Sequence, residues 1–84
     1  MDMQDARKSA IAEKPEAVIT AYRVLLKNSN KSIAIKLARE FSRGYVDGVH
    51  LSGDVRLSDD SLSLCYRAGY LAGSTALNEV MGKN

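Results

Sequence analysis

The sequence is poor in the residues that build the common metal, redox and catalytic sites. It has one cysteine, Cys65, and one histidine, His50, among 84 residues. A single cysteine cannot form an internal disulfide, and these two ligands are too few for a structural zinc site. Glycine-rich loops with the spacing of the Walker or Rossmann phosphate-binding motifs are also absent. We therefore expect no metal or cofactor, and the cysteine usage favours a reducing, cytoplasmic compartment.

Long hydrophobic runs are missing as well. The longest uninterrupted apolar stretches are a few residues long, whereas a membrane span requires about 18. Residues 1–8 mix charged and small side chains and lack the apolar core of a secretory signal. The sequence predicts a soluble protein with no membrane partner.

Neither sign of charge dominates the chain. Twelve basic and ten acidic residues give a net charge of +2, a smaller excess than nucleic-acid-binding domains usually carry. The length fits a single domain over residues 1–84, and a chain of this size buries roughly 63% of its extended surface on folding. Because the resulting core is thin, we expect a homo-oligomer, since a second copy is the simplest source of further burial.

Hydrophobic periodicity predicts a small all-α bundle. Apolar residues recur at three-to-four spacing in three long segments. The predicted helices cover about residues 15–28, 31–47 and 59–81. Pro15 lies in the first turn of the first helix, where its missing N–H costs least. The Asn-Ser-Asn cluster at residues 28–30 is expected to end that helix and to cap the next.

Two other segments are less regular. Residues 1–12 have weak helical spacing and are predicted to form a frayed helix or a mobile arm. Residues 49–57 consist of two short alternating arms around a turn, which predicts an ordered loop, with a short hairpin as the alternative. Ser58 is then the expected N-cap of the last helix, with Asp59 and Asp60 at the positive end of its dipole.

The pattern Gly-Tyr-x-x-Gly occurs twice, at residues 44–48 and 69–73. A helical glycine costs about 1 kcal/mol relative to alanine, so a further interaction must offset that cost. Two glycines four residues apart remove two side chains from one helix face and allow another backbone or an aromatic ring to approach closely. The pattern predicts a helix-packing groove or a self-association face made of Gly44, Gly48, Gly69 and Gly73. For Gly44 and Gly48, termination of the helix is an equal alternative.

The last predicted helix carries a wide apolar stripe. Its central positions are mostly small, and Leu64, Ala68 and Leu71 widen the stripe to one side. We therefore expect this helix to cross the middle of the fold with neighbours on two sides.

Catalytic chemistry has little support in the sequence. A nucleophilic mechanism would need His50 beside Cys65, but Cys65 falls on the apolar stripe of the last predicted helix, where a thiol behaves as a small hydrophobe. Asp59 and Asp60 could form a carboxylate pair, yet their place at a helix start already explains them. We expect the protein not to be an enzyme.

Basic residues recur on the second predicted helix. Lys36, Arg39 and Arg43 lie at three-to-four spacing and could contact the phosphates of a nucleic acid. Glu40 and Asp47 interrupt the same region, which favours an ordinary solvated face.

The hypothesis that these features support best is a small non-enzymatic protein-binding module that acts sterically as a regulator or inhibitor. Small chains without catalytic signatures include such proteins from phages and mobile elements, an analogy of class alone. Tyrosine and arginine are enriched at protein interfaces. The predicted partner-binding residues are Arg39, Arg43, Tyr45, Arg67 and Tyr70.

Two alternatives stay open. One is a nucleic-acid-binding regulator that uses Lys36, Arg39 and Arg43. The other is an oligomeric protein that sequesters a small anion or nucleotide against Arg43, Arg67 and a helix N-terminus.

Overall fold

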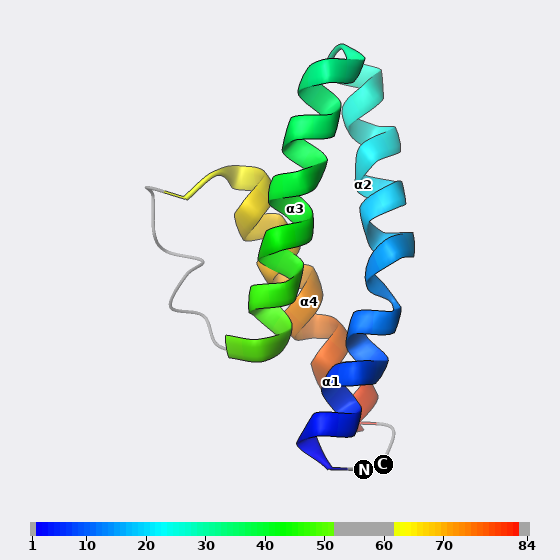
Figure 1. The fold of residues 1–84 in the computed structure, drawn as a ribbon, viewed down its shortest axis with the longest axis vertical. Coiled ribbons are helices and arrows are strands. Elements are labelled where there is room, and N and C mark those ends of the chain that lie inside the picture. The colour runs from blue at the N-terminus through cyan, green and yellow to red at the C-terminus, as the bar shows by residue number, and fades with distance from the viewer. Residues whose placement is uncertain (1, 52–61, 83–84) are drawn as a thin grey trace.

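The computed structural model describes residues 2–51 and 62–82 (Figure 1), and the predicted all-α class is confirmed. No strand occurs within these two ranges. The described helices are α1 (Met3–Ala12), α2 (Lys14–Asn28), α3 (Lys31–Leu51) and α4 (Leu64–Gly82).

Helices α1 and α2 together form one bent rod, along the right of Figure 1. Glu13 joins them, and its backbone N–H donates to the carbonyl of Ala10 (3.2 Å). Pro15 is in the first turn of α2 and has no N–H to donate to the preceding turn of α1. A missing helical hydrogen bond at proline is a common cause of such a change of direction.

Helix α1 is a packed element rather than a frayed helix or an arm. The side chain of Asp2 caps its first turn by accepting from the N–H of Asp5 (2.8 Å). Ala6 and Ala10 are fully buried in the main core cluster. Because alanine fills so little space, α1 can lie close to its neighbours α3 and α4.

The turn between α2 and α3 agrees with the prediction. Ser29 leaves α2 with an extended backbone, and the side chain of Asn30 accepts from the N–H of Ile33 (2.9 Å). The cluster at residues 28–30 therefore ends one helix and caps the next.

Helix α3 continues through both of its glycines to Leu51, so the predicted end at residue 47 is wrong. Residues 49–51 belong to the helix, which excludes them as the first arm of a hairpin or as part of a loop. Residues 52–57, the remainder of that prediction, lie outside the described residues. Gly48 does not terminate the helix because it is buried against α4.

Helix α4 begins at Leu64, five residues later than predicted. The hydroxyl of Ser63 accepts from the N–H of Tyr66 (3.1 Å) and so provides the N-terminal cap. Ser58, Asp59 and Asp60, the predicted first turn, lie outside the described residues.

Helices α3 and α4 pack in parallel at very short range. A Cβ atom on Gly44 would overlap the backbone carbonyl of Tyr66, and one on Gly48 would overlap that of Tyr70. The contacts of Gly69 and Gly73 are reciprocal, with the carbonyls of Phe41 and Tyr45. Residue numbers rise together in the two helices from one contact to the next, so the helices run in the same direction, and no side chain fits at these four glycine positions.

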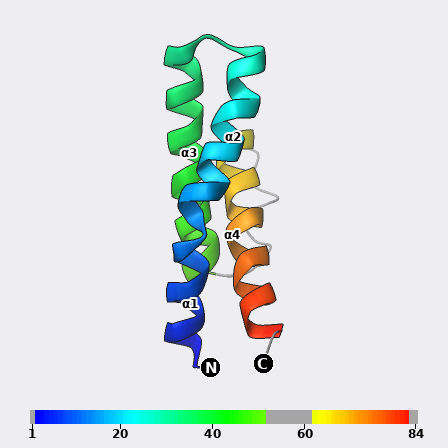
Figure 2. The same cartoon turned by 90° about the vertical axis from the view of Figure 1, so that its right-hand side faces the viewer.

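The remaining contacts leave the bundle open on one side. Helix α2 packs on α3 but makes almost no contact with α4, whereas α1 contacts both α3 and α4. Figure 2 shows α1 beside the lower part of α4, and Figure 1 shows α2 and α4 diverging above the bend. The molecule is consequently flat, with extents of 41 × 26 × 14 Å.

Candidate functional site

The four candidate glycines face each other inside the chain. All four are buried at the contact between α3 and α4. They therefore form an intramolecular packing face, and these four glycines offer no surface to a second copy or to another protein.

Tyr45 and Tyr70, predicted to bind a partner, are each 2% exposed. The hydroxyl of Tyr45 donates to the carbonyl of Ala10 (2.7 Å), which ties α3 to α1. The ring of Tyr70 lies 6.4 Å from that of Tyr66, whose hydroxyl donates to the carboxylate of Asp47. Both tyrosines are therefore core residues, because each follows a glycine at the tightest part of the helix pair.

The surroundings of Tyr45 are acidic. Burial raises the pKa of its hydroxyl, and the negative charges of Glu13 and Glu79 raise it further. The carboxylates of Glu13, at the junction of α1 and α2, and of Glu79, on α4, thus act on one buried phenol.

The apolar side of α2 is incompletely covered. Among its 15 residues none is buried, and Val24 is 53% exposed. On α4, Ala68 is exposed and Leu71 is 52% exposed. The sequence predicted that this side of α4 would be covered by a neighbour, but the neighbouring helix α2 diverges from it.

A groove of about 780 Å³ occupies the space between α2 and α4. Its floor is α3, which contributes Phe41 and Tyr45. Its walls are mostly small or apolar side chains, and three carboxylates line it. The wall residues are Glu13 directly before α2, then Glu16, Ala17, Thr20, Ala21 and Val24 on α2, and Ala68, Leu71, Ala72, Thr75, Ala76 and Glu79 on α4.

The groove has a chemical polarity along its length. Glu13 directly precedes α2, Glu16 lies in its first turn, and Glu79 lies near the end of α4, which runs antiparallel to α2. The acidic residues therefore gather at the end near the bend, while Val24 and Ala68 mark the apolar end. The site can bury apolar surface along most of its length and attract a cation at one end.

The predicted basic residues lie elsewhere. Lys36, Arg39 and Arg43 are exposed on α3 and line a separate hollow together with Glu40. Arg67 is half-buried on α4 and does not line that hollow. The structure therefore brings together the three α3 residues but not the predicted set of arginines and tyrosines.

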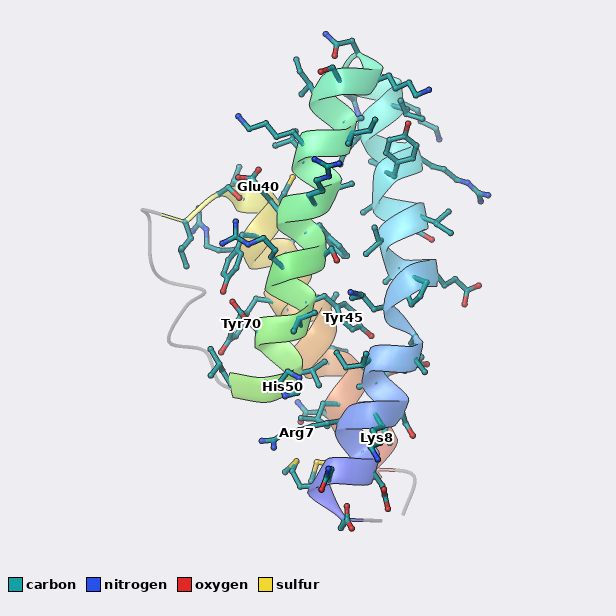
Figure 3. The ribbon with its side chains drawn as sticks, viewed as in Figure 1. Arg7, Lys8, Glu40, Tyr45, His50 and Tyr70 are labelled. Atoms are coloured by element: carbon teal, nitrogen blue, oxygen red, sulfur yellow. The ribbon has the colours of Figure 1, made fainter. Side chains whose placement is uncertain are left out.

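His50 and Cys65 are not brought together. Cys65 is half-buried, and burial followed by the charge of Glu40 raises the pKa of its thiol. His50 is exposed at the end of α3, where its carbonyl accepts from Arg7 (3.3 Å). Cys65 lies near Glu40, whose charge acts on it. Glu40 and His50 are ten residues apart on one helix, about 15 Å at the helical rise of about 1.5 Å per residue, and Figure 3 shows them well separated. No His–Cys pair is formed.

Within residues 2–51 and 62–82, no three metal-ligating side chains cluster, and no helix has the length and apolarity to cross a membrane. No protein-family model, curated protein or solved structure matches the chain.

Sequence reasoning missed this groove, although its residues carried a signal. Alanine recurs at Ala17 and Ala21 in one helix and at Ala68, Ala72 and Ala76 in another. Such spacing marks a helix face that a neighbouring backbone can approach. What it does not specify is whether the neighbour belongs to the same chain.

Proposed function

We propose that the protein is a non-enzymatic protein-binding module whose groove between α2 and α4 receives an amphipathic helix of a partner polypeptide. The observation that carries this proposal is the open apolar groove, one wall of which is a helix with no buried residue. Occupation of the groove would act sterically, by sequestering one face of the bound helix.

The composition of the groove defines the helix that it would accept. Small wall residues such as Ala68, Ala72 and Thr75 permit close approach of a helical backbone. The exposed apolar side chains Val24 and Leu71 gain burial when the groove is filled. The acidic end requires lysine or arginine at the corresponding end of the guest helix.

Binding of displayed helical peptides to the full-length protein tests the proposal. Selected peptides should share an apolar stripe with a basic residue at one end. Ala68→Trp fills the groove at an exposed position and should abolish their binding. Ala12→Trp, at an exposed alanine outside the groove, should leave binding unchanged. Equal binding by both variants would contradict the proposal.

Nucleic-acid binding is a second candidate function, favoured by one observation. Lys36, Arg39 and Arg43 are exposed, and none forms an ion pair with another residue of the two described ranges. If they contact phosphates, affinity for duplex DNA should fall steeply with added salt and be lost in the triple alanine variant. Absence of binding at low salt would remove this candidate.

A further inference from the structure

We propose that the groove is filled by α2 of a second copy of this chain, so that two copies form a twofold-symmetric dimer with their α2 helices antiparallel. This inference rests on the proposed function, because it names the occupant of the same groove. The order of charges along α2 favours this occupant.

One face of α2 carries residues at alternating spacings of four and three, the repeat of a helix–helix seam. The residues on this face are Ala17, Thr20, Val24 and Lys27, and Glu13, the N-cap of α2, continues it at the same spacing. All of them except Lys27 line the groove, and Lys27 is exposed at the next position of the same face. Lys27 forms no ion pair with another residue in the described part of the chain.

This face is complementary to itself only in the antiparallel orientation. Glu13 precedes Thr20 by seven residues, and Lys27 follows Thr20 by seven. A twofold axis at Thr20 therefore places each Glu13 opposite the partner's Lys27, which gives two Glu–Lys ion pairs. A parallel pairing would instead place like charges together, which is unfavourable.

The same orientation brings a positive charge to the acidic end of the groove. In the antiparallel arrangement the guest α2 runs parallel to α4, so the partner's Lys27 arrives at the end where Glu13 and Glu79 lie. These are the carboxylates whose charges act on Tyr45. A foreign helix would need a basic residue at that position, whereas a second copy already has one.

Steric fit and burial also favour a second copy. The residues next to the axis, Ala17 and Thr20, are small, so two α2 backbones can approach each other. Val24, 53% exposed in the monomer, would be covered by the partner. Isologous twofold dimers are the commonest homo-oligomers because each residue of the interface is used twice.

Disulfide crosslinking of the full-length chain tests the position of the axis. In a Cys65→Ala background, Thr20→Cys should give a covalent dimer under mild oxidation, because residues at a twofold axis face their own copies. Lys36→Cys, exposed on α3 away from the groove, is the matched control and should remain largely monomeric. Equal crosslinking at the two positions would overturn the inference.

Charge exchange tests the register independently. Glu13→Lys and Lys27→Glu should each weaken dimerisation by about tenfold, since two pairs are affected and exposed pairs contribute up to about 1 kcal/mol each. The double variant should restore the wild-type dissociation constant in sedimentation equilibrium. Both residues are exposed, so the fold should be retained and circular dichroism should be unchanged. A double variant no better than the single ones would overturn the proposed register.

The outcomes separate this inference from the proposed function. If the wild-type protein is a monomer that binds helical peptides, and Ala68→Trp blocks this binding, the proposed dimer is overturned and the proposed protein-binding function stands. A dimer that neither crosslinks through Thr20→Cys nor responds to charge exchange uses another surface and also overturns the inference. A monomer that binds no helical peptide overturns both proposals.

Discussion

Gly44 of α3 lies directly against the backbone carbonyl of Tyr66 in α4, with no room for a side chain between them. Three equivalent contacts at Gly48, Gly69 and Gly73 continue the same close approach. Dispersion contacts between the two backbones offset the entropic cost of helical glycine. The glycine pairs therefore hold the parallel helices together and position α4 as one wall of the groove.

Gly44→Ala should destabilise the protein despite the higher helix propensity of alanine. The added methyl group would meet a carbonyl oxygen and nearby backbone atoms rather than a flexible side chain, so the helices must separate. Overpacking of this kind costs about 1–3 kcal/mol in the free energy of unfolding, measurable by urea denaturation. Gly82→Ala is the matched control, because no atom lies within 4 Å of its Cβ position and its stability should be unchanged or slightly raised. A higher midpoint for Gly44→Ala would contradict the close packing.

Tyr45→Phe should lower the free energy of unfolding by about 0.5–1.5 kcal/mol. The substitution removes the hydroxyl that donates to the carbonyl of Ala10, while that carbonyl keeps its bond from the backbone N–H of Glu13. Tyr22→Phe, at a half-buried tyrosine without a hydrogen bond to another described residue, should have little effect in the same thermal or urea measurement. Similar losses in both variants would show that the bond to α1 contributes nothing specific.

Stability should decrease as the pH rises above about 10. Burial, Glu13 and Glu79 raise the pKa of Tyr45 above its ordinary value of 10.0 in the folded state. The unfolded chain therefore loses this proton first, and unfolding is favoured from the ordinary pKa up to the raised one. The slope of unfolding free energy against pH in this window should be smaller in Tyr45→Phe than in the wild type. Identical slopes would show that Tyr45 titrates normally.

Cys65 should react slowly with iodoacetamide at neutral pH. Burial and the neighbouring charge of Glu40 raise the pKa of its thiol above its ordinary value of 9.0, so the reactive thiolate is scarce. Reaction should be faster in urea, where the thiol is exposed, and somewhat faster in folded Glu40→Gln. Mass spectrometry of the alkylated protein measures both rates. A folded-state rate equal to that in urea would contradict the burial of this side chain.

Much of the secondary structure could be predicted from local chemistry. Periodic apolar residues indicated the helices, and Asn30 was predicted within the cluster that ends α2 and caps α3. The last helix was placed too early because several serines precede it, and Ser63 rather than Ser58 provides its cap. Several serines could each cap the helix, so the local sequence does not fix its first residue, which depends on tertiary contacts.

Residue spacing along one helix is enough to predict that this chain forms helices and that two of them carry faces free of side chains. The meeting of those glycine faces, and the burial of Tyr45 and Tyr70, follow from how the helices pack. The same packing leaves the side of α4 that faces α2 uncovered, because α2 diverges from α4 above the bend. These outcomes depend on the relative directions of helices distant in sequence, and periodicity within a helix carries no information about which neighbour covers each face.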